Sequence, residues 1–169
     1  MGAGARVLSD GFDAVRAVVH EALDGVAGEE LTHRLDADAN SLGWLVWHLT
    51  RVQDSMVCAA LGLDDLWSAQ GWDARFAMAG SAATGEGHTS EQVATVRADA
   101  ATLLGYHDAV HARTSAELAK LDDTLLSEPL RIDGEPPTTV GAWLVMALGG
   151  DLQHAGQAAF VRGILDRAR

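Results

Sequence analysis

Two histidines and one aspartate stand at positions from which they could hold a metal ion. His48 lies between Leu45 and Val52 on an apolar stripe of helical spacing, and His154 lies on a similar stripe near the end of the chain. Asp151 precedes His154 by three residues, so both side chains leave a helix on the same side. Imidazoles and carboxylates are zinc ligands, and three protein ligands leave a fourth position for water or substrate. The pattern predicts a metal site of His48, His154 and Asp151.

A structural role fits the same residues. A single inward histidine is commonly a core residue that is hydrogen-bonded to a neighbour, so His48 could simply pair with Asp151. A rival metal pair is His107 and His111 in YHDAVHA, because histidines four apart on a helix can share a metal. The simpler interpretation of that second pair is a partly exposed position near the rim of the fold. Spacing alone leaves these alternatives open.

Other reactive or aromatic residues carry weaker signals. Cys58 is the only cysteine, which excludes an internal disulfide and fits a reducing compartment. It is rotated away from the face of His48, and we interpret it as a small buried hydrophobic residue. Trp47, Trp67 and Trp72 are expected either to belong to the core or to border a site.

Four stretches show the apolar spacing of amphipathic helices, and none shows the alternation of a strand. They cover roughly residues 9–26, 40–61, 89–121 and 139–167. The third is expected to start at Thr89, whose spacing to Gln92 fits a capping box. Residues 62–89 form a long connection with short helical turns and a small, polar tip, SAATGEGH. The pattern predicts an all-α four-helix bundle with a long, partly helical crossover between its second and third helices.

The whole chain, residues 1–169, is expected to form one domain, since its length suits a single core. Its formal net charge of −12, without a basic cluster, argues against nucleic-acid and anionic-membrane partners. No basic leader and no long uncharged apolar run is seen, so a soluble, cytoplasmic protein is expected.

Two adjacent glycines, Gly149 and Gly150, interrupt the pattern of the last helix directly before Asp151. Each glycine in a helix interior costs about 1 kcal/mol relative to alanine. Such departures tend to fall at functional or strained sites, and here they would let the helix deform beside His154.

Three segments, NSLGWLVWHLTRVQDSMV, GWDARFAM and DLQHAGQAAFVRGIL, resemble the DinB-like superfamily in its actinobacterial branch of mycothiol transferases and maleylpyruvate isomerases. The resemblance covers about residues 8–166 and implies a four-helix bundle, a homodimer and a divalent metal, zinc or nickel. It further implies a protein that joins a low-molecular-weight thiol of the mycothiol type to a small electrophile.

The same resemblance places metal ligands at His48 and His154. The family's remaining ligand, a His, Glu or Asp four residues before the last histidine, corresponds here to Gly150. Where the family's second helix often carries an acidic residue and a histidine, this chain has Ser55 and Met56. Asp151 is the substitute ligand that we expect.

If the metal is bound, Arg51, Trp47 and Gln157 are the residues expected to contact or orient the thiol and substrate; no catalytic residue is assigned. Arg51 would bind acidic groups, and Gln157, one turn after His154, would orient the site. The alternative is a non-catalytic bundle that lost its third ligand, and that binds a small apolar ligand or acts as a dimeric binding protein.

Overall fold

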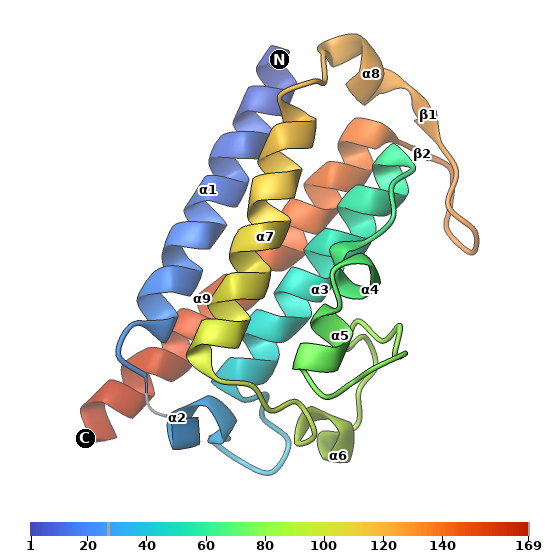
Figure 1. Ribbon diagram of the computed structural model, residues 1–169. Helices are drawn as coiled ribbons and strands as arrows, with labels where there is room; N and C mark the ends of the chain where they lie inside the picture. Colours follow the sequence, from blue (N-terminus) through green and yellow to red (C-terminus); the bar gives the residue numbers. More distant parts are fainter. Residues whose placement is uncertain (27, 169) are drawn as a thin grey trace.

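Four long helices form the body of the molecule, as the computed structural model shows (Figure 1). They are α1 (Ala3–Leu23), α3 (Leu42–Leu61), α7 (Ala100–Leu118) and α9 (Val140–Ala168). The structure describes residues 1–26 and 28–168. Helix α3 packs against α7 and α9, and α1 packs against the same two helices from the other side. The predicted all-α four-helix bundle is confirmed.

Side-chain contacts show how the helices run. Trp143 on α9 donates from its indole Nε1 to the backbone oxygen of Met56 on α3 at 3.0 Å. One end of α3 thus meets the start of α9, and His48, nearer the start of α3, meets His154 further along α9. The two helices are therefore antiparallel, and their inward stripes face one another.

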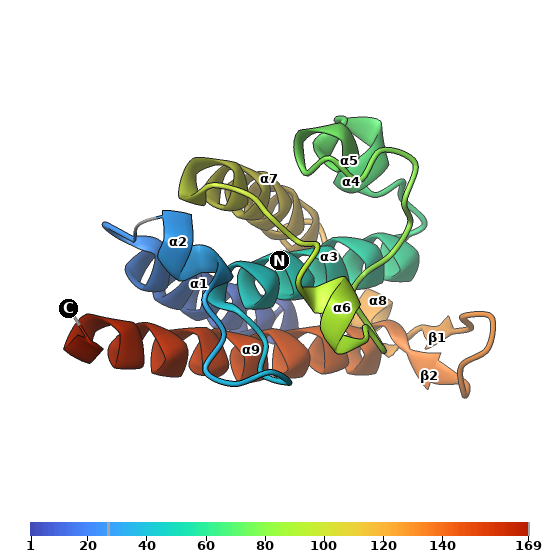
Figure 2. The same ribbon diagram turned by 90° about the horizontal axis from the view of Figure 1, so that it is seen from below.

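The third long helix begins later than the sequence predicts. Thr89 and Gln92 do form a capping box, but the helix that they start, α6 (Ser90–Val93), is only one turn long. Helix α7 begins after Asp99, whose side chain caps the amide of Thr102. The segment therefore has two N-caps: Thr89 starts α6, and Asp99 starts α7, the helix of the bundle. Helix α6 lies apart from α7 (Figure 2).

Shorter elements complete the fold. Helix α2 (Gly28–Thr32) follows α1, and α4 (Leu66–Ala69) and α5 (Trp72–Arg75) belong to the crossover. Helix α8 (Asp123–Ser127) leads into a two-stranded antiparallel ladder of β1 (Pro129–Leu130) and β2 (Thr138–Thr139), in which Pro129 pairs with Thr139. The sequence shows no strand pattern here because each strand is only two residues long.

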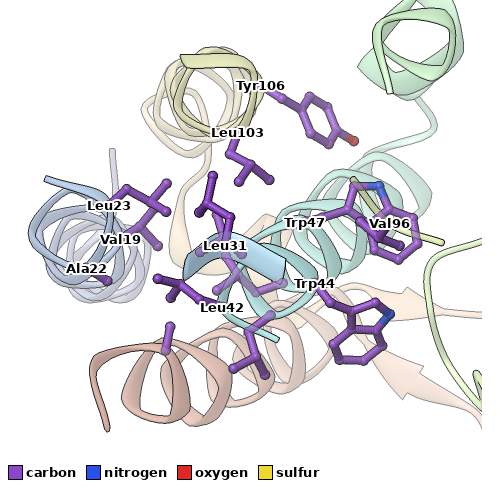
Figure 3. Close-up of a cluster of buried hydrophobic side chains, with 14 of the residues drawn as sticks. Val19, Ala22, Leu23, Leu31, Leu42, Trp44, Trp47, Val96, Leu103 and Tyr106 are labelled. Carbon is purple, nitrogen blue, oxygen red and sulfur yellow. The ribbon is translucent and has the colours of Figure 1, made fainter. Parts of the chain in front are cut away.

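The main core lies where α1, α2, α3, α7 and α9 meet (Figure 3). It is rich in aliphatic and aromatic side chains that are almost fully buried. Among them are Val19, Leu23, Leu31, Leu42, Trp47, Leu103 and Tyr106. A second cluster around Phe12, Leu118 and Leu144 fills the other end of the bundle. Within residues 1–26 and 28–168, no helix has the length and apolar character needed to cross a membrane.

Helix α9 passes through Gly149 and Gly150 without a break, so the two glycines do not interrupt it. A Cβ atom at either position would meet nothing within 4 Å outside the helix itself. Neither glycine is therefore needed for a close approach between helices.

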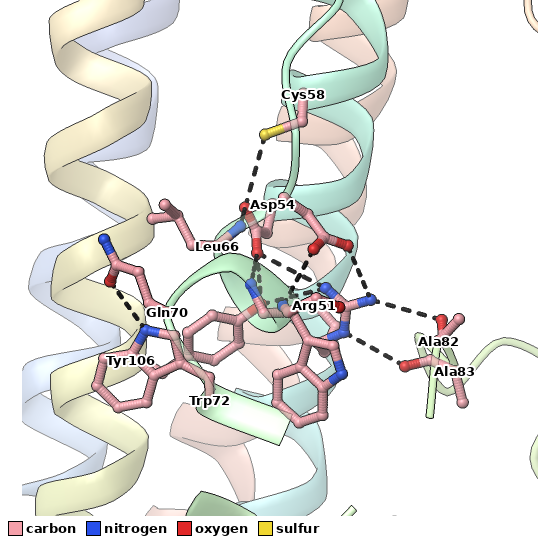
Figure 4. Close-up of polar contacts among 12 residues, drawn as sticks. Arg51, Asp54, Cys58, Leu66, Gln70, Trp72, Ala82, Ala83 and Tyr106 are labelled. Carbon is pink, nitrogen blue, oxygen red and sulfur yellow. Dashed lines mark hydrogen bonds and ion pairs between the residues drawn. The ribbon is translucent and has the colours of Figure 1, made fainter. Parts of the chain in front are cut away.

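A buried polar network attaches the crossover to the bundle (Figure 4). Asp54 on α3 accepts hydrogen bonds from the amides of Leu66 and Trp67, both at 3.0 Å, and from the Tyr106 hydroxyl of α7 at 2.8 Å. Arg51, one turn earlier, lies 3.6 Å from the Asp54 carboxylate and donates to the Tyr106 hydroxyl at 3.2 Å. One carboxylate thus joins α3, α7 and the crossover.

Further contacts of Arg51 reach the far end of the crossover. Its guanidinium donates to the backbone oxygens of Ala82 and Ala83, and it lies over the Trp67 ring at 4.8 Å. The Asp65 carboxylate is 3.6 Å away. Both ends of the segment from 65 to 83 are therefore held by the same cation.

Replacing Asp54 with alanine should cost about 3–5 kcal/mol of unfolding free energy, because it leaves the buried Arg51 without its main counter-charge. The measurement is urea unfolding followed by circular dichroism. Asp64→Ala, on an exposed neighbouring carboxylate, serves as the control and should change the free energy by less than about 0.5 kcal/mol. Equal losses in the two variants would contradict the role assigned to the network.

Candidate metal centre

His48 and His154 lie against each other between α3 and α9. Their ring centroids are 4.7 Å apart, and the ring planes meet at 80°. His48 is 4 % exposed, whereas His154 is partly exposed. Two positions separated by more than a hundred residues are thus brought into contact, as the inward stripes of the two helices predict.

Both imidazoles use the same nitrogen to contact the protein. The Nδ1 of His48 lies 2.7 Å from the backbone oxygen of Thr84, and the Nδ1 of His154 lies 2.8 Å from the side-chain oxygen of Gln157. An amide oxygen only accepts hydrogen bonds, so each Nδ1 donates, and the neutral ring carries its lone pair on Nε2. Outer partners of this kind orient the imidazoles that bind metals in proteins.

His48 is kept neutral by its surroundings. Burial lowers its pKa from the usual 6.5, and the nearby His154 and His88 lower it further, while the hydrogen bond to Thr84 and the charge of Glu86 act in the opposite direction. Burial is the largest of these effects. A neutral imidazole is the form that binds a metal, so this site is ready for one at neutral pH.

The crossover returns to the bundle directly over His48. Gly85 has a φ of +101°, and a Cβ atom there would lie 2.7 Å from His48 Nδ1 and 2.8 Å from the Trp47 ring. Only glycine fits this backbone conformation at this distance. On the other side, the Trp44 ring stacks on His48 at 4.5 Å and donates from Nε1 to His88 at 3.2 Å. His48 is therefore held between an indole and the crossover.

A cavity of about 480 Å³ opens next to this part of α3. Its walls combine apolar side chains with carboxylates from the crossover and from the loop between β1 and β2. The lining residues are Val52, Ser55, Met56, Ala59, Thr84, Glu86, Ile132, Asp133, Glu135, Trp143 and Met146. A larger cavity of about 610 Å³ lies at Cys58, Asp65 and Ser68; among the described residues no histidine lines either cavity, but only the smaller one is lined by Thr84, which bonds His48. The smaller cavity is therefore the better candidate for a substrate site.

Asp151 is completely buried on the inward face of α9, and neither of its carboxylate oxygens has a hydrogen-bond partner among residues 1–26 and 28–168. Burial raises its pKa well above 3.8. Among the residues that the structure describes, no three His, Cys, Asp or Glu side chains are grouped so as to hold a metal. Ligation by Asp151 stays a prediction, and the structure as it stands brings together only the two histidines.

The remaining predicted site residues are placed as follows. Gln157 contacts His154, in keeping with an orienting role. Trp47 is fully buried, its indole nitrogen has no partner, and its ring packs on Trp67 and His88. Arg51 is 1 % exposed and in contact with protein groups, so it holds the crossover instead of facing the cavity.

The two histidines of the rival pair differ in burial: His107 lies in the core, whereas His111 is partly exposed, as predicted for both. His107 is fully buried, its Nδ1 lies 3.1 Å from the Thr50 hydroxyl, and burial lowers its pKa to about 3. His111 instead bonds to Asp13 at 2.7 Å. Cys58 is buried as expected, and burial raises its pKa to about 12. A thiol that holds its proton so firmly is a poor nucleophile.

Sequence reasoning missed the residues of the crossover tip. Thr84, Gly85, Glu86 and His88 all lie in the stretch that composition favours as a mobile linker, yet they surround His48. The available signal was the pair of glycines around Glu86 beside a histidine, which is typical of a loop held close to another element.

Comparison with known proteins agrees with this architecture. Residues 11–158 match the family model described as the DinB superfamily. The chain belongs to the DinB superfamily. Its fold is similar to the crystal structure of a conserved protein from Enterococcus faecalis, with a TM-score of 0.85, 29 % sequence identity and 96 % of each chain covered. No match was found among curated proteins.

The pH dependence of the unfolding free energy tests whether the buried carboxyl of Asp151 is protonated in the folded protein. An unfolded aspartate ionises near pH 4, whereas burial raises the pKa of Asp151 in the folded protein, so folding takes up a proton. This contribution to stability is complete below about pH 4 and is lost as the pH rises through the folded-state pKa. Asparagine cannot ionise. The unfolding free energy of Asp151→Asn relative to wild type should therefore increase by about 1.4 kcal/mol per pH unit above about pH 4.

Urea unfolding from about pH 4.5 to pH 8, with a chelator present, measures this difference. The exposed Asp10→Asn is the control, for which the difference from wild type should stay constant. A constant difference for Asp151→Asn as well would show that the buried carboxyl is ionised or paired.

Proposed function

We propose that this DinB-superfamily chain is a metal-dependent transferase that joins a low-molecular-weight thiol, of the mycothiol type, to a small electrophile. The observation that carries the proposal is the contact of His48 with His154, in which each ring donates from Nδ1 and keeps its Nε2 lone pair. Membership of the superfamily supports the same function.

The residues present fit a divalent metal of the zinc or nickel type. His48 and His154 would hold it through Nε2, since an outer hydrogen bond occupies Nδ1 of each ring and fixes its orientation. When bound, such a metal lowers the pKa of a coordinated thiol and so supplies thiolate at neutral pH.

The protein groups divide the remaining work. Thr84 and Gln157 keep the two imidazoles in the tautomer that leaves Nε2 free. Met56, Trp143 and Met146 give the neighbouring cavity an apolar wall for the carbon skeleton of an electrophile. The carboxylates on the rim can accept hydrogen bonds from hydroxyl or amino groups of the thiol. Cys58 takes no part, because it is buried and keeps its proton.

The predicted homodimer would cover an unpartnered face of α9. Val145, Leu152 and Phe160 are 48 to 65 % exposed on the side of α9 that faces away from the bundle. These three side chains recur every two turns of α9, so one partner surface could cover all of them. The row supports the proposal of a dimer through α9, which the binding-protein alternative shares.

Removing one ligand or its outer partner should have graded effects. His154→Ala should weaken zinc binding by at least about 100-fold, and Gln157→Ala by about 10–100-fold, because only the second variant keeps the metal-binding nitrogen. Thiol transfer to a chromogenic aryl halide, with mycothiol as donor, should fall in the same order. Isothermal titration of the metal-free protein gives the affinities.

His33→Ala, which removes an exposed histidine outside the site, is the matched control and should change neither quantity. Full zinc affinity in His154→Ala would refute the metal centre. A wild-type protein that binds zinc but shows no thiol transfer would favour the non-catalytic binding protein.

A carboxylate can be introduced at position 150, where the resemblance to the superfamily places a metal ligand. Gly150→Asp should tighten zinc binding by at least about tenfold, since it adds a carboxylate one turn before His154 where a Cβ atom meets nothing. Gly149→Asp gives the same gain in helix propensity, of a few tenths of a kcal/mol, but points about 100° away from position 150 around the helix. The control should gain stability without gaining zinc affinity. Equal affinities in wild type and both variants would contradict the assignment of position 150.

A further inference from the structure

We propose that the third protein ligand of this centre comes from the crossover and is the carboxylate of Glu86. The inference rests on the proposed metal function and names a donor outside α9. It is drawn from three features of the described residues: the path of the backbone over His48, the availability of the Glu86 carboxylate, and the positions of the competing donors.

The backbone before Glu86 is held against the His48 ring. The oxygen of Thr84 accepts the hydrogen bond from His48 Nδ1 at 2.7 Å, and Gly85 comes so close that a Cβ atom would lie 2.7 Å from the same nitrogen. The amide of Glu86 bonds back to the Thr84 hydroxyl at 3.5 Å. Because Glu86 directly follows these anchored residues, its side chain starts next to His48.

The carboxylate of Glu86 is free to act. It is exposed, it lines the cavity beside Val52, and it makes no hydrogen bond or ion pair with the described part of the chain. Its charge already reaches His48, where it favours the protonated ring. A cation placed between His48 and His154 would attract the same charge, and the Glu86 side chain would break no hydrogen bond with the described residues in turning toward it.

The competing donors are worse placed. Asp151 is fully buried in the packed bundle, and among the described residues it forms no three-donor group with the two histidines. His88 accepts the indole hydrogen of Trp44 and stacks on Trp47 with centroids 5.7 Å apart, so its ring is already held. Gly150 has no side chain. Glu86 is exposed on a loop, so it is the donor whose recruitment needs no repacking of the bundle.

Two imidazoles and one carboxylate are a common donor set of catalytic zinc sites, in which a fourth position stays open. Glu86 lines the cavity and the two histidines do not, so Glu86 is the ligand that would connect the metal to the cavity. The carboxylate would also couple the crossover to metal binding, so loading the site should hold the tip of the crossover in place.

Zinc titration of the metal-free protein tests the inference, with Glu86→Gln as the variant and Glu135→Gln as its matched control. Both residues line the same cavity and both changes remove one negative charge, but only Glu86 follows the segment bound to His48. Glu86→Gln should weaken zinc binding by at least about tenfold, whereas Glu135→Gln should match wild type. Cobalt absorption should change in intensity for Glu86→Gln only, which reports a ligand change independently of activity.

The outcomes separate this inference from the proposed function. Zinc binding that depends on His48 but is equal in wild type and Glu86→Gln would overturn the role of Glu86 and leave the metal centre intact. Equal weakening by Glu86→Gln and Glu135→Gln would also overturn it, because a general effect of cavity charge would then explain both. Zinc binding that survives His48→Ala would overturn the metal centre itself.

Discussion

The buried interaction between Arg51, Asp54 and Tyr106 is the constraint on which the candidate site depends. Arg51 and Asp54 are each about 1–2 % exposed, and taking two such charges out of water is costly unless further hydrogen bonds satisfy them. Here the bonds come from the crossover: the amides of Leu66 and Trp67 bind the carboxylate, and the oxygens of Ala82 and Ala83 bind the guanidinium. The charges can be buried only when the crossover is in place.

This coupling has a consequence for His48. The segment that ends at Ala83 is followed at once by Thr84 and Gly85, which lie on the His48 ring. The position of the imidazole hydrogen bond therefore depends on an ion pair one turn away on the same helix. Trp67 strengthens the arrangement, since its indole donates to the oxygen of Ser81 at 2.7 Å while its ring lies under Arg51.

The sequence carried enough information to predict the bundle and the histidine pair. Apolar residues at helical spacing identify four buried faces, and His48 and His154 sit on two of them, so packing those faces brings the rings together. It could not predict the break between Val93 and Ala100, because Thr89 and Asp99 are both good caps and only tertiary packing selects between the helices they start. The burial of Arg51 was missed because an arginine beside a site is ordinarily solvent-facing, and its partners are distant in sequence.

The crossover tip shows the limit of reasoning from composition. Small and polar residues such as those of SAATGEGH usually mark a mobile loop, and nothing local reveals that Gly85 lies against an imidazole. Its meaning depends on Trp44, Trp47 and His48, which are about forty residues earlier and form the surface on which the loop rests. A glycine needed for close approach and a glycine in a flexible linker look the same in one sequence.

The two informative glycines of this protein act in opposite ways. At Gly150 the missing side chain leaves open space on α9 and removes a donor from beside His154. At Gly85 the missing side chain lets the crossover reach His48 and places the charge of Glu86 within electrostatic reach of that ring. A helix holds its ligands at fixed spacing, whereas a loop donor can turn toward a cation or away from it. A metal site that takes its third ligand from the loop is therefore less rigid, but that ligand can move away and open the site. The buried Arg51–Asp54 network holds the crossover up to Ala83, so only the few residues beyond it can move in this way.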